Sequence, residues 1–154
     1  MMTEPLDIKS GLPGPAGLLG NFAPHPFELD GIRFACMEAF LQSLKVKDPQ
    51  ARVQIYSKLG KAAKEAGMKH DWRPEGKLYF KDHIIDRHGP DYQALLDRAY
   101  AALAAQNEIY RDALKETGTR PLIHTIGKDD PKETVLTERE LCDRLMKLRD
   151  ALSR

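Results

Sequence analysis

Residues 19–45 read LGNFAPHPFELDGIRFACMEAFLQSLK, and two structural signals follow one another in this stretch. Apolar and polar residues alternate over 27–34 around Asp30-Gly31, a pair that is typical of the tight turn in a β-hairpin. Apolar residues then recur at spacings of three and four over 36–46, which predicts a helix with one buried face. A lone hairpin is only marginally stable, so we expect it to pack against helices.

The predicted helix 36–46 carries a carboxylate beside its apolar stripe. Glu38, Gln42 and Lys45 lie close to one face of this helix, because a helix has about 3.6 residues per turn. This polar row could be a solvated surface on which Glu38 bonds to Gln42 and to a lysine partner. It could equally form the polar floor of a pocket that faces the loop 18–26. The spacing alone is compatible with both interpretations.

The segment before the hairpin is rich in residues that interrupt regular structure. It has four Gly among residues 11–20 and four Pro among residues 13–26. This composition predicts that residues 1–26 form neither helix nor regular sheet, and that the Gly residues make turns or let the backbone approach a ligand. We therefore expect an irregular N-terminal segment over 1–17 and a single domain over 18–154.

A second helix is predicted over 49–66. Asp48 is its expected cap, because Pro49 suits the first turn of a helix. Gly67 is the expected C-terminal stop. The candidates for the inner face of this helix are Val53, Ile55, Tyr56, Leu59 and either Ala62 or Ala63.

The rest of the chain reads as further helices with small β elements. Thr137 and Glu140 have the spacing of a capping box, which predicts the start of the last helix. The other expected elements are a short hairpin within 77–89, a helical stretch over 90–117 with a break near 106–107, and a short strand over 121–127. The predicted fold class is mainly α (α+β): a single compact helical domain with one or two short β-hairpins or strands beside its functional site.

Composition excludes several broad classes. A chain of 154 residues fits one domain. Its 24 basic and 23 acidic residues give a net charge of +1, which argues against nonspecific nucleic-acid binding but allows a local phosphate site. No apolar run approaches the roughly 20 residues that span a bilayer, and the N-terminus does not resemble a signal peptide. We therefore expect a cytoplasmic protein without membrane contact.

The two cysteines, Cys36 and Cys142, lie in apolar, helix-like contexts. The simplest interpretation is two buried thiols in a reducing compartment, although a disulfide is compatible with the sequence. A thiol nucleophile formed by Cys36 and a distant His is also conceivable, but nothing in the sequence defines its geometry.

Two further clusters contain residues that can carry chemistry. Asp71 precedes Trp72, the single Trp of the chain, within a predicted loop. Trp72 could be an aromatic plug over the core, or it could stack on a flat ring while Asp71 bonds to a ring nitrogen or a sugar hydroxyl. His83, Asp86 and His88 are residue types that bind metals, but their spacing favours a solvated turn.

The order of these motifs resembles the NADAR superfamily, whose best-known branch is the YbiA-like riboflavin-intermediate N-glycosidases. The matching segments are LGNFAPHPFELDGIRFACMEAFLQSLK, GKAAKEAG with its Ala63-Lys64 pair, and HDW. Later segments, from YQALLDRAYAAL to TVLTERELCDRL, extend the likeness over about 18–150. The first motif has Gly20 where the family has Ser. Many members also carry an Asp followed by Trp-Gly near the C-terminus, whereas this chain has Asp129 and Asp130 without a Trp.

The resemblance implies hydrolysis of a bond between ribose C1 and a base-type nitrogen, without a metal or other cofactor. The implied substrate is a phosphoribosylated intermediate of riboflavin synthesis or ADP-ribosylated guanine in nucleic acid. The balanced charge favours a small molecule over bulk DNA or RNA, although a single modified base could still be reached. Two alternatives are a non-catalytic module that binds ADP-ribose and a structural partner protein with a large exposed apolar face.

The resemblance also suggests roles for individual residues. Glu38 would stabilise the positive charge that develops at C1 and accept a proton from the attacking water. Lys45 would either bind phosphate or attack the opened sugar as an amine. The implied substrate-binding residues are Asn21, Phe22, Gln42, Asp71 and Trp72.

Overall fold

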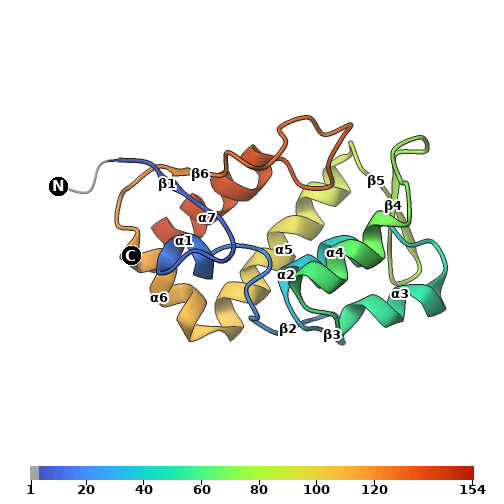
Figure 1. Cartoon of the computed structure of the whole chain (residues 1–154), viewed down its shortest axis with the longest axis horizontal. Coiled ribbons are helices and arrows are strands. Elements are labelled where there is room, and N and C mark those ends of the chain that lie inside the picture. The colour runs from blue at the N-terminus through green and yellow to red at the C-terminus, as the bar shows by residue number, and fades with distance from the viewer. Residues whose placement is uncertain (1–3) are drawn as a thin grey trace.

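The computed structural model describes residues 4–154, which form seven helices and six short strands (Figure 1). Helices account for 46% of these residues and strands for 12%, and each strand belongs to a two-stranded sheet. This architecture confirms the predicted α+β class. None of the helices within residues 4–154 has the length and apolar character needed to cross a membrane.

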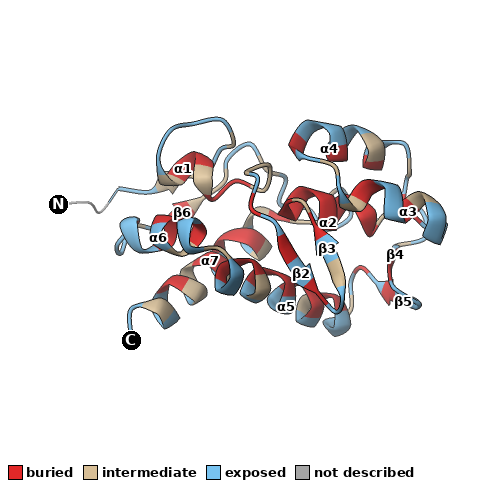
Figure 2. Cartoon of the chain, turned by 90° about the horizontal axis from the view of Figure 1, so that it is seen from below, coloured by how far each residue is buried: buried red, intermediate tan, exposed pale blue. Residues whose placement is uncertain are grey.

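Helix α2 (Met37–Ser43) lies at the centre of the molecule. All of its residues are buried, as Figure 2 shows by colour. Phe40 makes edge-on contacts with the rings of Phe27, Phe34 and Phe80, with ring centroids 5.3 to 6.2 Å apart. The helix expected over 36–46 is therefore confirmed over Met37–Ser43, and all of its residues are buried rather than those of one face alone.

The predicted first hairpin is confirmed as strands β2 (Phe27–Leu29) and β3 (Ile32–Phe34). Asp30 and Gly31 both have positive φ, 51° and 83°, as a type I′ turn requires. The hairpin packs against α5 (Pro90–Gln106), as a marginally stable two-stranded ribbon must.

The second half of the chain follows the expected order. A second hairpin joins β4 (Lys77–Phe80) to β5 (His83–Asp86). The helical stretch breaks after Gln106, so that α5 and α6 (Glu108–Glu116) are separate helices. The last helix, α7 (Glu138–Leu152), begins at the predicted capping box of Thr137 and Glu140 and packs against α5 and α6.

The single helix predicted over 49–66 is wrong. The chain instead forms α3 (Pro49–Tyr56) and α4 (Gly60–Met68). Helical geometry is interrupted over 57–59, just after the Tyr56 carbonyl accepts a hydrogen bond of 2.9 Å from the Ala35 backbone N–H. Helix α4 then begins at Gly60, whose φ is +20°. Two predicted inner residues, Val53 and Leu59, are 54% and 52% exposed. The predicted inner residues Ile55 and Ala63 are buried, as expected.

The prediction that residues 1–26 contain no regular structure is also wrong. Leu6–Asp7 form strand β1, which pairs in parallel with β6 (Leu122–Ile123), and Pro15–Leu18 form helix α1. Composition could not reveal the strand, because its hydrogen-bonding partners lie more than 100 residues away along the chain. Residues 1–3 of the predicted irregular segment lie outside the described residues. The boundary between 1–17 and 18–154 stays a prediction.

Candidate functional site

A cavity of about 530 Å³ opens beside α2. Segments distant in sequence form its walls, because the β1–β6 pairing brings the N-terminal segment next to residues that follow β6. Besides α2 and Lys45 just after it, the walls include residues 9–10 after β1, residues 21–22 after α1 and one residue of α4. Residues 133–136 and residues 124–128 other than Thr125 complete the lining.

Glu38 is a buried carboxylate that lines this cavity. Glu38 is only 8% exposed, and Gln42, one helical turn later, is 5% exposed. Gln42 Nε2 donates a hydrogen bond of 2.6 Å to Glu38 Oε2. Burial raises the pKa of Glu38, against the opposing effects of the Gln42 hydrogen bond and the nearby Lys45. The solvated-row interpretation is therefore excluded for Glu38 and Gln42, although its Glu–Gln hydrogen bond is present.

The loop after α1 is attached to the start of α2. The Glu38 backbone N–H donates to the Asn21 carbonyl oxygen at 3.0 Å, which satisfies one of the free donors of the first helical turn. From α5, the Tyr100 hydroxyl donates to Asn21 Oδ1 at 2.8 Å. The amide nitrogen is then the group that Asn21 can offer to a ligand. These bonds explain why Asn21 and Phe22 line the same cavity as Glu38.

Lysine side chains give the cavity a basic lining. Lys45 follows α2, Lys64 lies on α4, and Lys9 and Lys128 complete the set. Burial lowers the pKa of Lys45, and the attraction of Glu38 opposes this shift. Among residues 4–154, no ion pair within 4.0 Å joins Lys45 to an acidic side chain. These cations can therefore attract an anionic group of a ligand.

His124 is a cavity residue to which sequence analysis gives no role. Its Nδ1 lies 2.7 Å from the Ile8 carbonyl oxygen, which can only accept, so Nδ1 carries the hydrogen and Nε2 can act as an acceptor in the neutral ring. Its backbone N–H donates to Glu138 Oε2 at 2.6 Å. These contacts depend on the β1–β6 pairing and on α7, and no local motif reveals them.

Comparison with known proteins places the chain in a family. The family model described as "Bacteriophage protein GP30.3" matches residues 14–150. The chain belongs to the bacteriophage GP30.3 family. One relative is the "Uncharacterized 17.1 kDa protein in Gp30-rIII intergenic region" of Enterobacteria phage T4. It is 38% identical over 149 residues, which cover 96% of this chain and 98% of that protein.

This GP30.3-family chain also has the fold of a bacterial protein. The NMR structure of E. coli YbiA matches with a TM-score of 0.66, over 99% of this chain and 87% of that one. The sequence identity is 19%, so the match concerns the fold. It confirms, at the level of the fold, the resemblance to YbiA-like proteins that the motifs indicate.

Two predicted binding residues of the GP30.3-family protein lie outside the cavity lining. Asp71 is exposed, and its carboxylate accepts hydrogen bonds from the Arg73 side chain, which also contacts Glu133 at 3.1 Å. Trp72 is 7% exposed and packs in the main hydrophobic core, which agrees with the aromatic-plug interpretation. The cavity brings together Asn21, Phe22, Glu38, Gln42 and Lys45 without Asp71 or Trp72.

The remaining candidates are structural in this protein. Cys36 and Cys142 are buried free thiols, as predicted. Burial raises the pKa of Cys36, which disfavours the reactive thiolate. Asp86 Oδ1 accepts a hydrogen bond from the His88 backbone at 2.9 Å, and His83 is exposed. Within the part of the chain that the structure describes, no three His, Cys, Asp or Glu side chains gather as metal ligands would.

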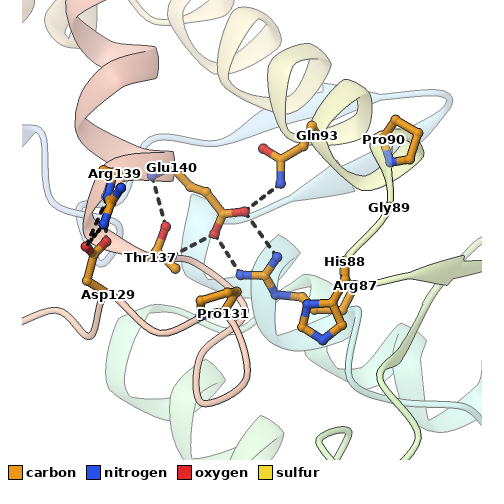
Figure 3. A pocket seen from close by; sticks show the side chains of 10 residues that line it. All are labelled: Arg87, His88, Gly89, Pro90, Gln93, Asp129, Pro131, Thr137, Arg139 and Glu140. Atoms are coloured by element: carbon orange, nitrogen blue, oxygen red, sulfur yellow. Dashed lines mark hydrogen bonds and ion pairs between the residues drawn. The ribbon is translucent and has the colours of Figure 1, made fainter.

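A second cavity, of about 570 Å³, lies between the start of α5 and the start of α7 (Figure 3). Arg87 and Glu140 meet there in an ion pair of 2.7 Å, with their side chains 1% and 12% exposed. Gln93 and the Thr137 backbone also donate to Glu140, and Arg87 donates to the Thr134 carbonyl. These charges are satisfied within the protein, so we assign this cluster to stability and the α2 cavity to function.

Proposed function

We infer that this GP30.3-family protein is an N-glycosidase that hydrolyses the bond between ribose C1 and a base-type nitrogen. The observation that carries this proposal is the buried carboxylate of Glu38 on the wall of a cavity that Lys45 and Lys64 also line. A buried carboxylate whose pKa is raised by burial is typical of a functional site. The fold shared with YbiA supports the same proposal.

In the proposed reaction, the C1–N bond breaks and its electron pair leaves with the nitrogen. Positive charge develops on C1 and the ring oxygen, as in the hydrolysis of other glycosides. The Glu38 carboxylate stabilises this charge and accepts a proton from the water whose oxygen bonds to C1. The departing nitrogen gains a proton from solvent. Gln42 holds the carboxylate through its 2.6 Å hydrogen bond.

The basic lining suits a substrate with phosphate close to the ribose. A phosphoribosylated intermediate of riboflavin synthesis and an ADP-ribosylated guanine both have this feature. We assign Lys45 to phosphate binding as a point charge, with Asn21 and Phe22 holding the ribose or the base. A module that binds ADP-ribose without cutting it would use the same cavity.

The proposal is tested by a panel assay. The protein is incubated with a riboflavin-pathway phosphoribosylamine and, separately, with an oligonucleotide carrying ADP-ribosylated guanine, and free base is measured by mass spectrometry. Release from either substrate supports the proposal and identifies the substrate class. Calorimetric binding of ADP-ribose without release from either substrate would favour the non-catalytic module.

The two roles considered for Lys45 are separated by its replacement with Met. As a phosphate binder, Lys45 contributes binding that is equal in the ground and transition states, so Lys45→Met is expected to raise KM with little change in kcat. As an amine nucleophile, Lys45 would form an imine with the opened sugar, which cyanoborohydride would reduce to a stable adduct. A ribosyl mass increment on Lys45 in wild-type protein would overturn the phosphate assignment.

The pH dependence of kcat reports the ionisation of Glu38. The base is active only when ionised, and burial raises its pKa above the ordinary value of 4.5. We therefore expect kcat to fall on acidification with a midpoint above 4.5. The measurement is kcat against pH on a substrate that lacks groups titrating in this range. A midpoint at or below 4.5 would exclude Glu38 as the base.

A further inference from the structure

Helices α2 and α4 approach each other closely at Gly67. This glycine is buried on α4 and faces Gln42 of α2. A Cβ built on Gly67 would lie 1.9 Å from Gln42 Oε1, 2.7 Å from its Cδ and 2.8 Å from its Cβ. Each of these distances is shorter than a non-bonded carbon contact allows. The observed position of the Gln42 side chain therefore requires a glycine at 67.

The Gln42 amide has few other restraints. Its Nε2 donates to Glu38 Oε2, whereas its Oε1 is buried without a hydrogen-bond partner among the described residues. A single hydrogen bond does not define how an amide lies against the neighbouring helix. The packing against Gly67 supplies the missing restraint, because the side chain fills the space that a Cβ would occupy.

The backbone gives no competing reason for glycine at this position. Gly67 lies within α4 and is not among the glycines with positive φ, so it does not act as a left-handed helix cap. Glycine weakens a helix interior relative to alanine. The earlier apolar positions of the same helix are Ala62, Ala63 and Ala66. What distinguishes position 67 is the contact with Gln42.

We propose that Gly67 is a positioning residue for the Glu38–Gln42 pair. Its missing side chain lets the Gln42 amide lie where it donates to Glu38, and this bond holds the carboxylate at the cavity wall. The consequence for turnover rests on the proposed function. The consequence for Glu38 itself is a property of the folded protein and can be measured without any substrate.

The charged groups that face Glu38 define the expected effect of Gly67→Ala. Lys45, Lys64 and His124 all lower the pKa of Glu38, and the Gln42 hydrogen bond lowers it further against the effect of burial. An added methyl at 67 displaces the Gln42 amide and leaves these three side chains in place. The pKa of Glu38 is therefore expected to rise in Gly67→Ala.

The experiment is a double-mutant cycle read by carboxyl ¹³C NMR titration of Glu38. Gly67→Ala and Gln42→Ala are each expected to raise the pKa of Glu38, and the double variant is expected to match Gln42→Ala, because both changes remove one interaction. Gly89→Ala is the control. A Cβ there would lie no closer than 3.4 Å to its neighbours, and it lies at the start of α5. An unchanged Glu38 pKa in folded Gly67→Ala would overturn the proposal.

Stability and turnover complete the test. If Gly67→Ala fails to fold, its combination with Gln42→Gly must fold, because glycine at 42 removes all three close contacts, and an unfolded combination would overturn the proposal. On a confirmed substrate, Gly67→Ala is expected to lower kcat by about ten- to a hundredfold. The acidic limb of the kcat–pH profile of this variant should move to higher pH. A raised Glu38 pKa in a protein that cleaves no N-ribosyl substrate would refute the proposed function while upholding the role of Gly67.

Discussion

Glu38→Gln is expected to lower kcat by about 10²-fold or more, the scale on which an enzyme depends on a general acid or base. The amide can still accept the hydrogen bond from Gln42 Nε2, so the geometry of the pair is preserved. What is lost is the negative charge beside C1 and the site that accepts the proton of water. The measurement is kcat on the substrate identified by the panel assay, with substrate affinity measured in parallel.

The stability of Glu38→Gln separates loss of chemistry from loss of fold. Burial raises the folded-state pKa of Glu38 above 4.5, so the native protein binds this proton more tightly than the unfolded chain. The stability that this proton binding contributes is thus fully present below the pKa of Glu38 in the unfolded chain. It is lost as the pH rises through the higher pKa of Glu38 in the folded protein. At neutral pH the neutral amide is therefore expected to leave the free energy of unfolding unchanged or increased.

A matched control for Glu38→Gln is Glu65→Gln, on α4. The Glu65 side chain is 64% exposed and forms only a surface pair with Lys61, so this variant is expected to keep wild-type turnover. If Glu38→Gln retained most of its turnover on a confirmed substrate, Glu38 would not be the general base. A purely structural partner protein would likewise show no change in activity when Glu38 is replaced.

Arg87→Met is expected to lower the free energy of unfolding by about 3–5 kcal/mol, the effect of removing one partner of a buried ion pair. The variant leaves Glu140 with a 12% exposed side chain and without its cation. It also removes the two hydrogen bonds that the guanidinium donates to the Thr134 carbonyl. The measurement is urea-induced unfolding at neutral pH.

Two comparisons sharpen the Arg87 experiment. Arg98→Met breaks a surface pair with Asp30 in which Arg98 is 51% exposed, and it is expected to cost at most about 1 kcal/mol. Burial raises the pKa of Glu140, but its hydrogen bonds with Arg87, Thr137 and Gln93 outweigh this, and the pKa is lowered below 4.5. The stability that ionised Glu140 contributes is lost as the pH falls through its pKa in the folded protein. The loss of unfolding free energy caused by Arg87→Met should therefore shrink in acid. Equal costs for Arg87→Met and Arg98→Met at neutral pH would contradict the assignment.

Local sequence signals predict the elements that local physics controls. The Asp30-Gly31 pair predicts the first hairpin because few residue pairs accept two positive φ angles in succession. The capping box of Thr137 and Glu140 predicts the start of α7 because it satisfies helix donors within four residues. The same approach fails over 57–59, where the predicted helix 49–66 is divided and the Tyr56 carbonyl bonds to the distant Ala35 backbone instead.

The candidate site is predictable only in part. Residues on or next to α2, such as Glu38, Gln42 and Lys45, follow from helical spacing together with the motif resemblance. Trp72 has the sequence context of a ligand-stacking residue, but the core buries it, because an isolated aromatic residue carries no sign of the side it faces. His124 joins the site only because β1 pairs with β6.

The sequence by itself determined the two hairpins, the start of α7 and the helix that carries Glu38, since each depends on residues a few positions apart. Tertiary structure alone decided that Glu38 is buried beside a cavity, that Gly67 faces Gln42, and that Arg87 meets Glu140 across 53 positions. The physical reason is that burial and charge pairing depend on segments that meet only in the folded chain. Spacing along the sequence reports the face on which a residue lies but not what covers that face.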